Sequence, residues 1–373
     1  MERTLLEGNE AIGRAAMAAG CDFFAGYPIT PATTIYNTML KLLPPNGGIC
    51  LQGEDEIASI GFCLGAAMAG KKAMTATSGP GISLYSEQIS FAIGSEIPIV
   101  IVDVQRLGPS TGSATKGADG DIQFLRWGNS GGLPVIVLAP VDVKDCYELT
   151  VQAFNLAEQY RCPVFLATNK EISMTRETLC LEDLSPAPLV SRRRADPEEP
   201  FLPFGVDEGQ QVPDFLPIGG KTLVRQTSST HGANGYITTD PDEIDRMQTR
   251  LKAKLTAGVV DFTCFDEIAD PHADTLVVAY GVTARAAKVA VQRLKERGTG
   301  ASLLILKTLW PVPQFLIREK AAPYRRVVMP EMNLGQYVRE LQRLLPDKEI
   351  AFVGQMNGEL IKPQQIVEGV EHG

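Results

Sequence analysis

Residues 52–106 read QGEDEIASIGFCLGAAMAGKKAMTATSGPGISLYSEQISFAIGSEIPIVIVDVQR, and this stretch decides the fold. An acidic cluster at 54–56 opens a segment rich in Ala and Gly, which predicts a slim helix that another backbone can approach closely. A short strand at 73–77 then ends in Thr-Ser-Gly-Pro-Gly, and the apolar run at 97–104 is typical of a buried parallel strand. Because ligands of open α/β sheets bind beyond the carboxyl ends of the strands, we expect the site to follow these two strands.

The same rhythm of strand and helix extends to both sides of this stretch. Further strands are predicted at residues 23–27, 49–51, 133–139 and 163–168, and a long helix is predicted at 143–160. Strands that alternate with helices in this way predict an α/β fold with a doubly wound parallel sheet. We assign this first domain to residues 1–183.

The remainder of the chain falls into two parts of different composition. Residues 184–239 contain many prolines and few periodic segments, which indicates an extended, surface-wrapping connection, and a charged helix follows at 240–255. A second α/β unit with a smaller parallel sheet is predicted from strands at 275–281, 301–307, 325–330 and 350–353. We therefore assign residues 184–270 to an extended connecting segment and residues 271–373 to a smaller α/β domain.

Composition excludes several classes of protein. The 373 residues are 44% hydrophobic and 21% charged, with a net charge of −9 and no stripe of Lys and Arg, so a nucleic-acid partner is not expected. The seven cysteines are irregularly spaced and form no CxxC, which argues against a disulfide framework or a metal site in this chain and fits a cytoplasmic enzyme. No signal-peptide pattern and no apolar run of about 18 residues is present, so no membrane span is expected.

Four residues at the ends of predicted elements are candidates for binding. Thr30 follows a strand, where its hydroxyl would either cap the next helix or contact a ligand. Ser78 begins a helix, where free N–H groups suit an anion, although a plain tight turn explains the motif equally well. Arg106 follows the buried strand and can hold a carboxylate or phosphate with two parallel hydrogen bonds. Glu56 either favours a helix dipole or faces a cofactor or partner.

Other motifs are rejected. The chain contains neither GxxxxGK[ST] nor GxGxxG after a strand, so nucleotide use is unsupported. Asp119-Gly120-Asp121 looks like the start of a thiamine diphosphate and magnesium motif, but a polar segment precedes it where that motif needs a hydrophobic strand. We predict no metal ligand in this chain, and we interpret Arg192-Arg193-Arg194 as solvated surface and His231 as a structural or solvated residue. Loops shaped for a ligand, with few reactive groups, indicate half of a site that another subunit completes.

The motifs together resemble a known family. The segments Gly26-Tyr27-Pro28-Ile29-Thr30-Pro31, Glu54-Asp55-Glu56, 75–81 (TATSGPG) and 103–106 (DVQR) occur in the order and spacing found in the alpha subunits of 2-oxoacid:ferredoxin oxidoreductases, closest to the 2-oxoglutarate enzymes. The C-terminal segments 308–311 (TLWP) and 331–336 (EMNLGQ) fit the same family. The resemblance implies a thiamine diphosphate pyrimidine-binding domain followed by a domain like the transketolase C-terminal domain.

The resemblance also implies an activity and partners. In this family a 2-oxoacid is oxidatively decarboxylated on thiamine diphosphate, electrons pass to ferredoxin, and the acyl group passes to coenzyme A, with the reverse carboxylation also possible. A beta subunit would carry the diphosphate and Mg²⁺ site and a [4Fe–4S] cluster, and separate gamma and delta subunits are expected. The substrate implied is 2-oxoglutarate. Branched-chain 2-oxoacids, or a non-catalytic scaffold for the beta subunit, are the alternatives.

The family's site residues map onto positions of this sequence. Glu56 would bind the aminopyrimidine N1′ of the cofactor, with Glu54 and Asp55 as rival candidates. Thr30 and Arg106 would contact the substrate carboxylate. Further residues implied for the cofactor are Tyr27, Pro28, Ile29, Thr30, Ser78 and Gly79, and those implied for the distal carboxylate of the substrate are Ser110 and Thr111.

Overall fold

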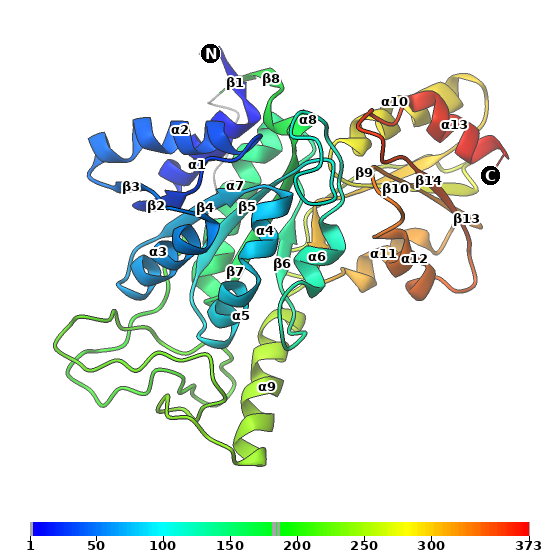
Figure 1. The fold of residues 1–373 in the computed structure, drawn as a ribbon. Helices are drawn as coiled ribbons and strands as arrows, with labels where there is room; N and C mark the ends of the chain where they lie inside the picture. The colour runs from blue at the N-terminus through cyan, green and yellow to red at the C-terminus, as the bar shows by residue number, and fades with distance from the viewer. Residues whose placement is uncertain (1–2, 181–183, 185–186, 373) are drawn as a thin grey trace.

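The structure is a computed structural model that describes residues 3–180, 184 and 187–372. Residues 181–183, where the predicted first domain ends, lie outside the described residues. Two α/β units stand side by side, and an extended segment and one long helix, α9 (Pro241–Thr256), lie below the first (Figure 1). In the described part of the chain, no helix is long and apolar enough to cross a membrane.

The first unit is built on a seven-stranded sheet with the order β12-β6-β7-β5-β4-β2-β3. Its strands are β2 (Phe23–Gly26), β3 (Ile49–Gln52), β4 (Ala73–Thr77), β5 (Ile99–Gln105), β6 (Ile136–Leu138), β7 (Pro163–Asn169) and β12 (Thr308–Trp310). All seven residues of β5 are buried, because this strand runs between β4 and β7 with helices on both faces. The predicted doubly wound sheet is confirmed.

Helices cover both faces of this sheet. They are α1 (Gly8–Ala18), α2 (Thr33–Leu42), α3 (Glu56–Met68), α4 (Gly79–Leu84), α5 (Ser86–Gly94), α6 (Ile122–Trp127), α7 (Val143–Tyr160) and α8 (Lys170–Ser173), with a 3-10 turn at Pro44–Asn46. A separate two-stranded antiparallel sheet, which we did not predict, pairs β1 (Arg3–Glu7) with β8 (Arg176–Cys180). Its alternating pattern is too short for periodicity to reveal.

The strand β12 comes from the C-terminal part of the chain but completes the first sheet. It pairs antiparallel with β6, at Thr308↔Leu138 and Trp310↔Val137. Without it, β6 would present an open edge. The C-terminal unit therefore contributes a strand to the N-terminal one.

The second sheet has the order β14-β13-β10-β11-β9. Its strands are β9 (Phe265–Ile268), β10 (Thr275–Ala279), β11 (Ser302–Leu306), β13 (Arg326–Glu331) and β14 (Glu349–Gly354), and its helices are α10 (Thr283–Glu296), α11 (Gln314–Ala321), α12 (Val338–Leu344) and α13 (Pro363–His372). The four predicted strands are parallel to one another, as expected. The strand β9, which was not predicted, adds to the edge of this sheet antiparallel to β11. The sequence FDEI is largely exposed at the sheet edge and lacks the apolar run that marks a central strand.

The connecting segment is extended, as predicted, and buried ion pairs attach it to the first unit. Its described residues from 187 to 240 form isolated bridges and neither helix nor strand. Arg192, expected at the surface, is 6% exposed, and its guanidinium and amide bind the carboxylate of Glu158 on α7. Arg250 and Lys254 of α9 bind the fully buried carboxylate of Glu96. The segment and α9 are thus anchored to the first unit.

Candidate active site

The carboxyl ends of β2, β4 and β5 bring three sequence motifs to one corner of the first sheet. The register sets Thr77, at the end of β4, beside Asp103 of β5. Residues 27–31 continue from β2, and Gln105 and Arg106 end β5 and follow it. The helix α3 begins beside these ends, so the predicted meeting of the motifs is what the topology produces.

Glu56 is the buried member of the acidic cluster. It is the first residue of α3 and is 7% exposed, whereas Glu54 and Asp55 are exposed. Asp55 caps the helix, because its carboxylate accepts a hydrogen bond from the amide of Ala58 at 2.7 Å. This cap fixes where the helix begins and turns the next side chain inward. Of the three acids considered from the sequence, Glu56 is the one that faces the inside.

Gly81 leaves the space that Glu56 occupies. A Cβ on Gly81 would lie 2.8 Å from Glu56 Cγ, 3.0 Å from Glu56 Oε1 and 2.0 Å from Thr77 Oγ1. The acid of α3 and the hydroxyl at the end of β4 therefore meet against a glycine of α4. Next to it, the Ser78 carbonyl accepts a hydrogen bond from the Gly81 amide at 2.7 Å, and a Cβ on Gly79 would lie 3.3 Å from Asp121 Oδ2.

Arg106 ties two loops together. It is buried, and its two terminal nitrogens donate to the carbonyl oxygens of Thr30, at 2.5 Å, and Thr111, at 2.9 Å. Each terminal nitrogen carries a second hydrogen, so the guanidinium retains donors for a ligand. Burial lowers the pKa of Arg106, and the carboxylate of Asp121 opposes that shift.

The structure brings most of the predicted residues together and leaves two outside. Tyr27 and Thr30 are exposed at the corner, Pro28 and Ile29 are partly buried, and Thr30 does not cap α2. Ser78 is fully buried at the start of α4. The side chains of Ser110 and Thr111 are exposed on the loop that closes at the Leu107–Ser113 bridge, and Thr111 contacts Arg106 through its carbonyl.

Several buried polar atoms of this corner have no hydrogen-bond partner among the described residues. These orphan atoms are Thr77 Oγ1, Ser78 Oγ, Asp103 Oδ1 and Oδ2, Arg106 Nε, Asp119 Oδ2 and Asp121 Oδ2. A buried polar atom without a partner costs about 1–3 kcal/mol, so a concentration of them needs a functional explanation. The orphan hydroxyls of Thr77 and Ser78 fit a polar ligand that binds near Glu56.

Three of these residues, Asp103, Asp119 and Asp121, were missed or rejected as site residues from the sequence. Burial, followed by repulsion from Asp121, raises the pKa of Asp103 well above its usual range. Burial raises the pKa of Asp119 to about 7 and that of Asp121 to about 6, the latter against the pull of Arg106. An Asp inside a buried strand was the signal available for Asp103. The Asp119-Gly120-Asp121 motif was tested only as a metal motif.

The C-terminal motif at 331–336 packs against the Asp119-Gly120-Asp121 motif. Asn333 donates from its amide to the Asp119 carbonyl at 2.8 Å, and Asp119 donates its own amide to the Met332 carbonyl at 2.9 Å. Asn169, at the end of β7, donates to Asp119 Oδ1 at 2.7 Å. The corner is therefore braced by both α/β units. The described residues contain no group of three or more His, Cys, Asp or Glu arranged to hold a metal ion.

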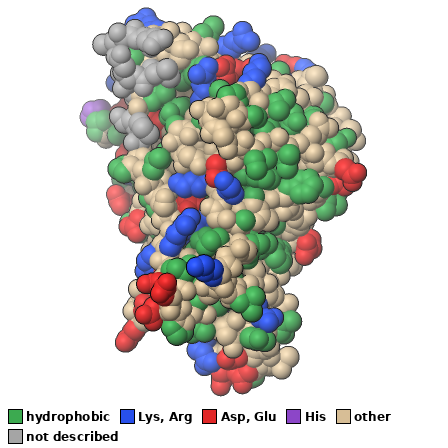
Figure 2. Space-filling view, turned by 90° about the vertical axis from the view of Figure 1, so that its left-hand side faces the viewer, with side chains coloured by type: hydrophobic (Ala, Val, Ile, Leu, Met, Phe, Trp, Pro, Cys, Tyr) green, Lys and Arg blue, Asp and Glu red, His purple; other side chains and the backbone are tan. Residues whose placement is uncertain are grey.

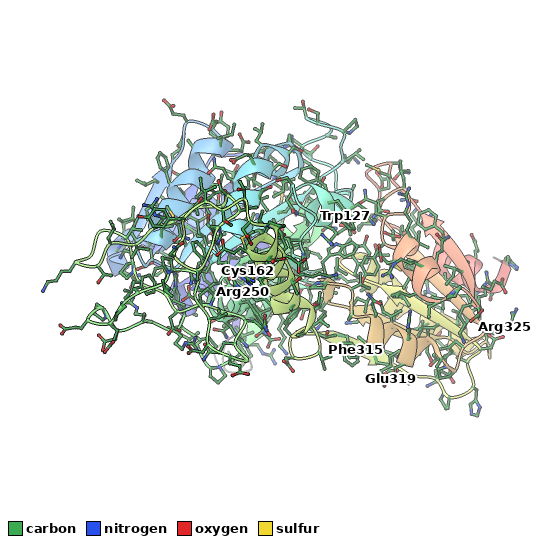
Figure 3. All side chains as sticks on the ribbon, turned by 90° about the horizontal axis from the view of Figure 1, so that it is seen from below. Trp127, Cys162, Arg250, Phe315, Glu319 and Arg325 are labelled. Carbon is green, nitrogen blue, oxygen red and sulfur yellow. The ribbon has the colours of Figure 1, made fainter. Side chains whose placement is uncertain are left out.

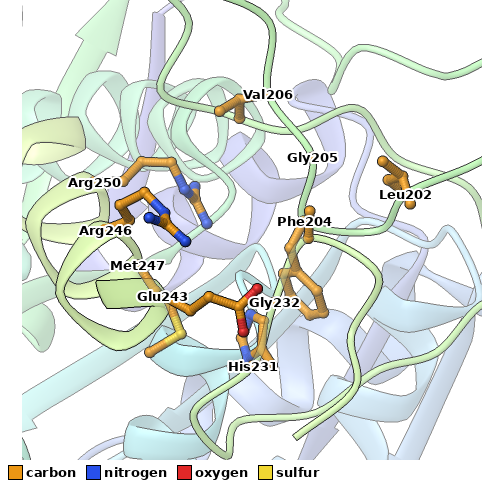
Figure 4. A pocket seen from close by; sticks show the side chains of 11 residues that line it. Leu202, Phe204, Gly205, Val206, His231, Gly232, Glu243, Arg246, Met247 and Arg250 are labelled. Carbon is orange, nitrogen blue, oxygen red and sulfur yellow. The ribbon is translucent and has the colours of Figure 1, made fainter. Parts of the chain in front are cut away.

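The cavities found among the described residues lie elsewhere, and two of them are described next. One, of about 650 Å³, opens at the junction of the two units, where Figure 3 labels Trp127 and Phe315. The other, of about 360 Å³, lies between the connecting segment and α9 and is lined by Phe204, His231 and Arg246 among others (Figure 4). His231 is 2% exposed and packs against Phe204 with the two rings tilted and their centroids 3.8 Å apart, which agrees with a structural role. Neither cavity includes a residue predicted for the site.

Comparisons with known proteins identify the family. The family model described as "Pyruvate flavodoxin/ferredoxin oxidoreductase, thiamine diP-bdg" matches residues 14–250, and "Pyruvate:ferredoxin oxidoreductase core domain II" matches residues 273–366. The 2-oxoglutarate synthase subunit KorA of Methanocaldococcus jannaschii is 38% identical over 371 residues, covering 99% of this chain and 100% of the relative. The chain belongs to the 2-oxoacid:ferredoxin oxidoreductase family. The resemblance drawn from the motifs is confirmed.

Within the 2-oxoacid:ferredoxin oxidoreductase family, relatives with different substrates are similar to this chain. The ketoisovalerate oxidoreductase subunit VorB of Methanothermobacter thermautotrophicus is 34% identical over 370 residues, covering 99% of this chain and 97% of the relative. The structure of the 2-oxoglutarate:ferredoxin oxidoreductase from Magnetococcus marinus, with 2-oxoglutarate, coenzyme A and succinyl-CoA bound, superposes with a TM-score of 0.92 at 34% identity. The match covers 99% of this chain and 65% of that one. A split-gene transketolase, at 15% identity and a TM-score of 0.55 over 98% of this chain and 97% of its own, shares the fold alone.

Proposed function

We propose that this chain is the alpha subunit of a complex that oxidatively decarboxylates 2-oxoglutarate, forming succinyl-CoA and CO2, and passes the electrons to ferredoxin, or runs the reverse carboxylation. The observation that carries the proposal is the buried Glu56, which lies against Gly81 at the start of α3 in a domain of the thiamine-diphosphate-binding family. Relatives that cover the whole chain are named for 2-oxoglutarate.

Glu56 has the setting that its implied role needs. Thiamine diphosphate, when bound, supplies the carbon nucleophile that attacks the 2-oxo group. A carboxylic side chain in a dry pocket forms a strong hydrogen bond to a ring nitrogen, and it can hold or yield a proton there. The hydroxyls of Thr77 and Ser78 would offer further polar contacts, and residues 27–30 and Gly79 follow the ends of β2 and β4 at the same corner.

Arg106 and Thr30 would orient the 2-oxoacid. The backbone carbonyls of Thr30 and Thr111 fix the guanidinium, so its remaining hydrogens have a defined direction for the substrate carboxylate. Ser110 and Thr111 lie on the same loop and would serve the distal carboxylate of a 2-oxodicarboxylic acid after that loop closes over the site.

The exposed surface near this corner fits a partner subunit. Large apolar side chains gather on the face seen in Figure 2, over α2, β3 and α3, and they include Leu40, Ile49, Ile57 and Phe62, each between 45% and 47% exposed. The strand β3 is one of the two edge strands of the sheet. We propose that a beta subunit covers this face and brings the Mg²⁺ site, the [4Fe–4S] cluster and the diphosphate contacts. Gamma and delta subunits, ferredoxin and coenzyme A complete the proposed assembly.

Substitution of Glu56 tests the proposal. In the assembled complex, Glu56→Ala should lower 2-oxoglutarate-dependent reduction of a viologen at least 100-fold, because the site loses its acid. Unchanged turnover would support the scaffold alternative. Turnover measured with a panel of 2-oxoacids distinguishes the two candidate substrates. A preference for branched-chain 2-oxoacids over 2-oxoglutarate would favour the activity for which the VorB relatives are named over the one for which the KorA relatives are named.

A further inference from the structure

The cavity of about 360 Å³ beside α9, which we call the α9 cavity, is lined by distant stretches of the chain (Figure 4). Side chains between residues 202 and 206 and at 231–233 come from the connecting segment, and side chains between 243 and 250 come from α9. The volume lies within the range of small-molecule sites, about 300–1,000 Å³. No residue assigned to the candidate active site lines the α9 cavity, so a ligand here would occupy a separate site.

His231 supplies a buried hydrogen-bond acceptor to the α9 cavity. Its Nδ1 lies 2.6 Å from the carbonyl oxygen of Ser229, and since a carbonyl can only accept, Nδ1 carries a hydrogen. Burial lowers the pKa of His231 below its ordinary value, so the ring is neutral near pH 7 and its Nε2 is an acceptor. The Nε2 atom is buried and has no hydrogen-bond partner among the described residues. A ligand that donates a hydrogen bond would satisfy it.

Glu243 brings a second acceptor to the same end of the cavity. A Cβ on Gly232 would lie 3.3 Å from Glu243 Oε1, so the carboxylate lies against the residue that follows His231. The Glu243 backbone amide donates to the Asp240 carboxylate, but within the described part of the chain the Glu243 carboxylate has no hydrogen-bond or ion-pair partner. An imidazole nitrogen and a carboxylate together suit a group with several N–H donors, such as an ammonium.

Arg246 brings a positive charge to the cavity one helical turn after Glu243. Side chains three residues apart on a helix start about 5–6 Å from each other, where opposite charges commonly pair. Among the described residues, however, Arg246 forms no ion pair with Glu243 or with any other acid, whereas the neighbouring Arg250 is already bound to Glu96. The guanidinium of Arg246 therefore keeps its donors for a carboxylate. The cavity thus presents an acid and a base that are not paired with each other.

The rest of the α9 cavity is apolar. Phe204 and Met247 are 4% and 7% exposed, and Leu202 and Val206 line the cavity from the connecting segment. An apolar group placed against these side chains would be removed from water, which favours binding. The ligand that matches the cavity has an ammonium, a carboxylate and an apolar group.

We propose that the α9 cavity binds an α-amino acid with an apolar side chain. The ammonium donates to His231 Nε2 and to the Glu243 carboxylate, and the carboxylate accepts from Arg246. The side chain of the amino acid packs against Phe204 and Met247. An α-amino acid carries both charges on one carbon atom and is neutral overall, so its binding adds no net charge to the cavity. This inference goes beyond the proposed function and does not depend on it.

Calorimetry near neutral pH on the full-length protein, purified with any subunits that accompany it, tests the inference. The probes are L-leucine, L-methionine, L-phenylalanine and L-valine, and we expect at least one of them to bind at a single site per chain. Two analogues of leucine, 4-methylpentanoate without the amino group and 3-methylbutylamine without the carboxylate, should bind at least about tenfold more weakly than leucine. Binding should also raise the unfolding temperature, because the ligand joins α9 to the connecting segment in the folded state.

Substitutions place the ligand in the α9 cavity. Glu243→Gln and Arg246→Gln should each weaken binding about tenfold, because each removes one charge-assisted contact. His231→Phe, which keeps a ring but removes the acceptor, should weaken binding as well. Asp245→Asn is the matched control, because Asp245 is an exposed acid of the same helix that does not line the cavity, and it should bind as the wild type does.

Three results would overturn the inference. The first is that none of the four amino acids binds at concentrations up to about 10 mM, the range of very weak complexes. The second is wild-type affinity in both Glu243→Gln and Arg246→Gln, which would place the ligand elsewhere. The third is an analogue that binds as tightly as leucine, since the amino group or the carboxylate would then not be recognised. Glu243 is half-buried and Arg246 is exposed, so these two substitutions decide the outcome even if His231→Phe fails to fold.

Discussion

Asn333 of the C-terminal unit donates a hydrogen bond to the backbone carbonyl of Asp119 in the N-terminal unit, with 2.8 Å between nitrogen and oxygen. The same side chain accepts from the amides of Gly335 and Gln336, at 2.9 and 3.0 Å. One amide group therefore orders the turn at 333–336 and holds the loop that carries the site acids. The position of that loop depends on a residue more than 200 positions away in the chain.

Asn333→Ala should weaken both the fold and the activity. The Asp119 carbonyl and two turn amides would lose their partner, which is expected to cost about 1–3 kcal/mol of unfolding free energy. Thermal unfolding and viologen-reduction assays of the assembled complex measure the two effects. Asn357→Ala is the control, because Asn357 also accepts a backbone amide but at an exposed site. Equal effects of the two substitutions would argue against the bracing role.

Gly81→Ala should lower activity by displacing Glu56 or Thr77. The new methyl group would lie 2.0 Å from Thr77 Oγ1 and 2.8 Å from Glu56 Cγ, so one of these groups must move. We expect weaker binding of thiamine diphosphate, measured by cofactor titration of the depleted complex, and a loss of turnover of at least tenfold. Gly65→Ala, at a position of α3 with open space around the glycine, should leave both unchanged and stabilise the helix by about 0.5–1 kcal/mol. Normal cofactor affinity in Gly81→Ala would show that the space is not needed.

Arg192→Met should destabilise the protein far more than Arg193→Met. Arg192 and Glu158 form a buried pair, and removal of one partner leaves the other charge without compensation, at a cost of about 3–5 kcal/mol. The neighbouring Arg193 pairs with Asp214 at the surface, where such pairs contribute about 0–1 kcal/mol. Midpoints of urea unfolding compare the two variants. A similar small shift for both would mean that the connecting segment is held by its other contacts.

Asp119→Asn should stabilise the protein at alkaline pH. The pKa of Asp119 is raised in the folded state to about 7, so folding favours the protonated form. Its stability contribution is complete below the pKa of the unfolded chain, about 4, and is lost as pH rises through the folded value. Near pH 8 the variant should therefore have a free energy of unfolding on the order of 2–4 kcal/mol higher than that of the wild type. Near pH 4 the two proteins should have the same free energy of unfolding. A difference that does not change with pH would show that Asp119 does not titrate in this range.

The sequence was informative where local pattern decides structure. Alternating apolar runs and helices predicted the first sheet, because a strand buried on both faces, such as β5, leaves a continuous apolar signal. The choice of Glu56 over its neighbours also has a local cause, since the Asp55 cap fixes the helix start. The motif order that indicated the family is confirmed by the comparisons.

Features that depend on partners far away in the sequence could not be predicted in the same way. The strands β9 and β12 are short and lie at sheet edges, where partners far away in the chain determine pairing. Arg192 looked like one of three surface arginines, because the sequence does not show that Glu158 faces it from α7. Asp103 was overlooked and Asp121 was rejected for a similar reason: nothing local indicates that both acids are buried near the end of β5.

The strand β12 has a consequence for how the polypeptide can be divided. Residues 308–310 pair with β6 at the edge of the sheet. A fragment that ends near residue 270 would therefore expose β6 as an edge strand with unpaired backbone N–H and C=O groups. Such a fragment should self-associate on expression, and co-production of the missing piece should rescue its solubility. The first unit thus depends on the C-terminal part of the chain for a complete sheet, even though each unit has a sheet of its own.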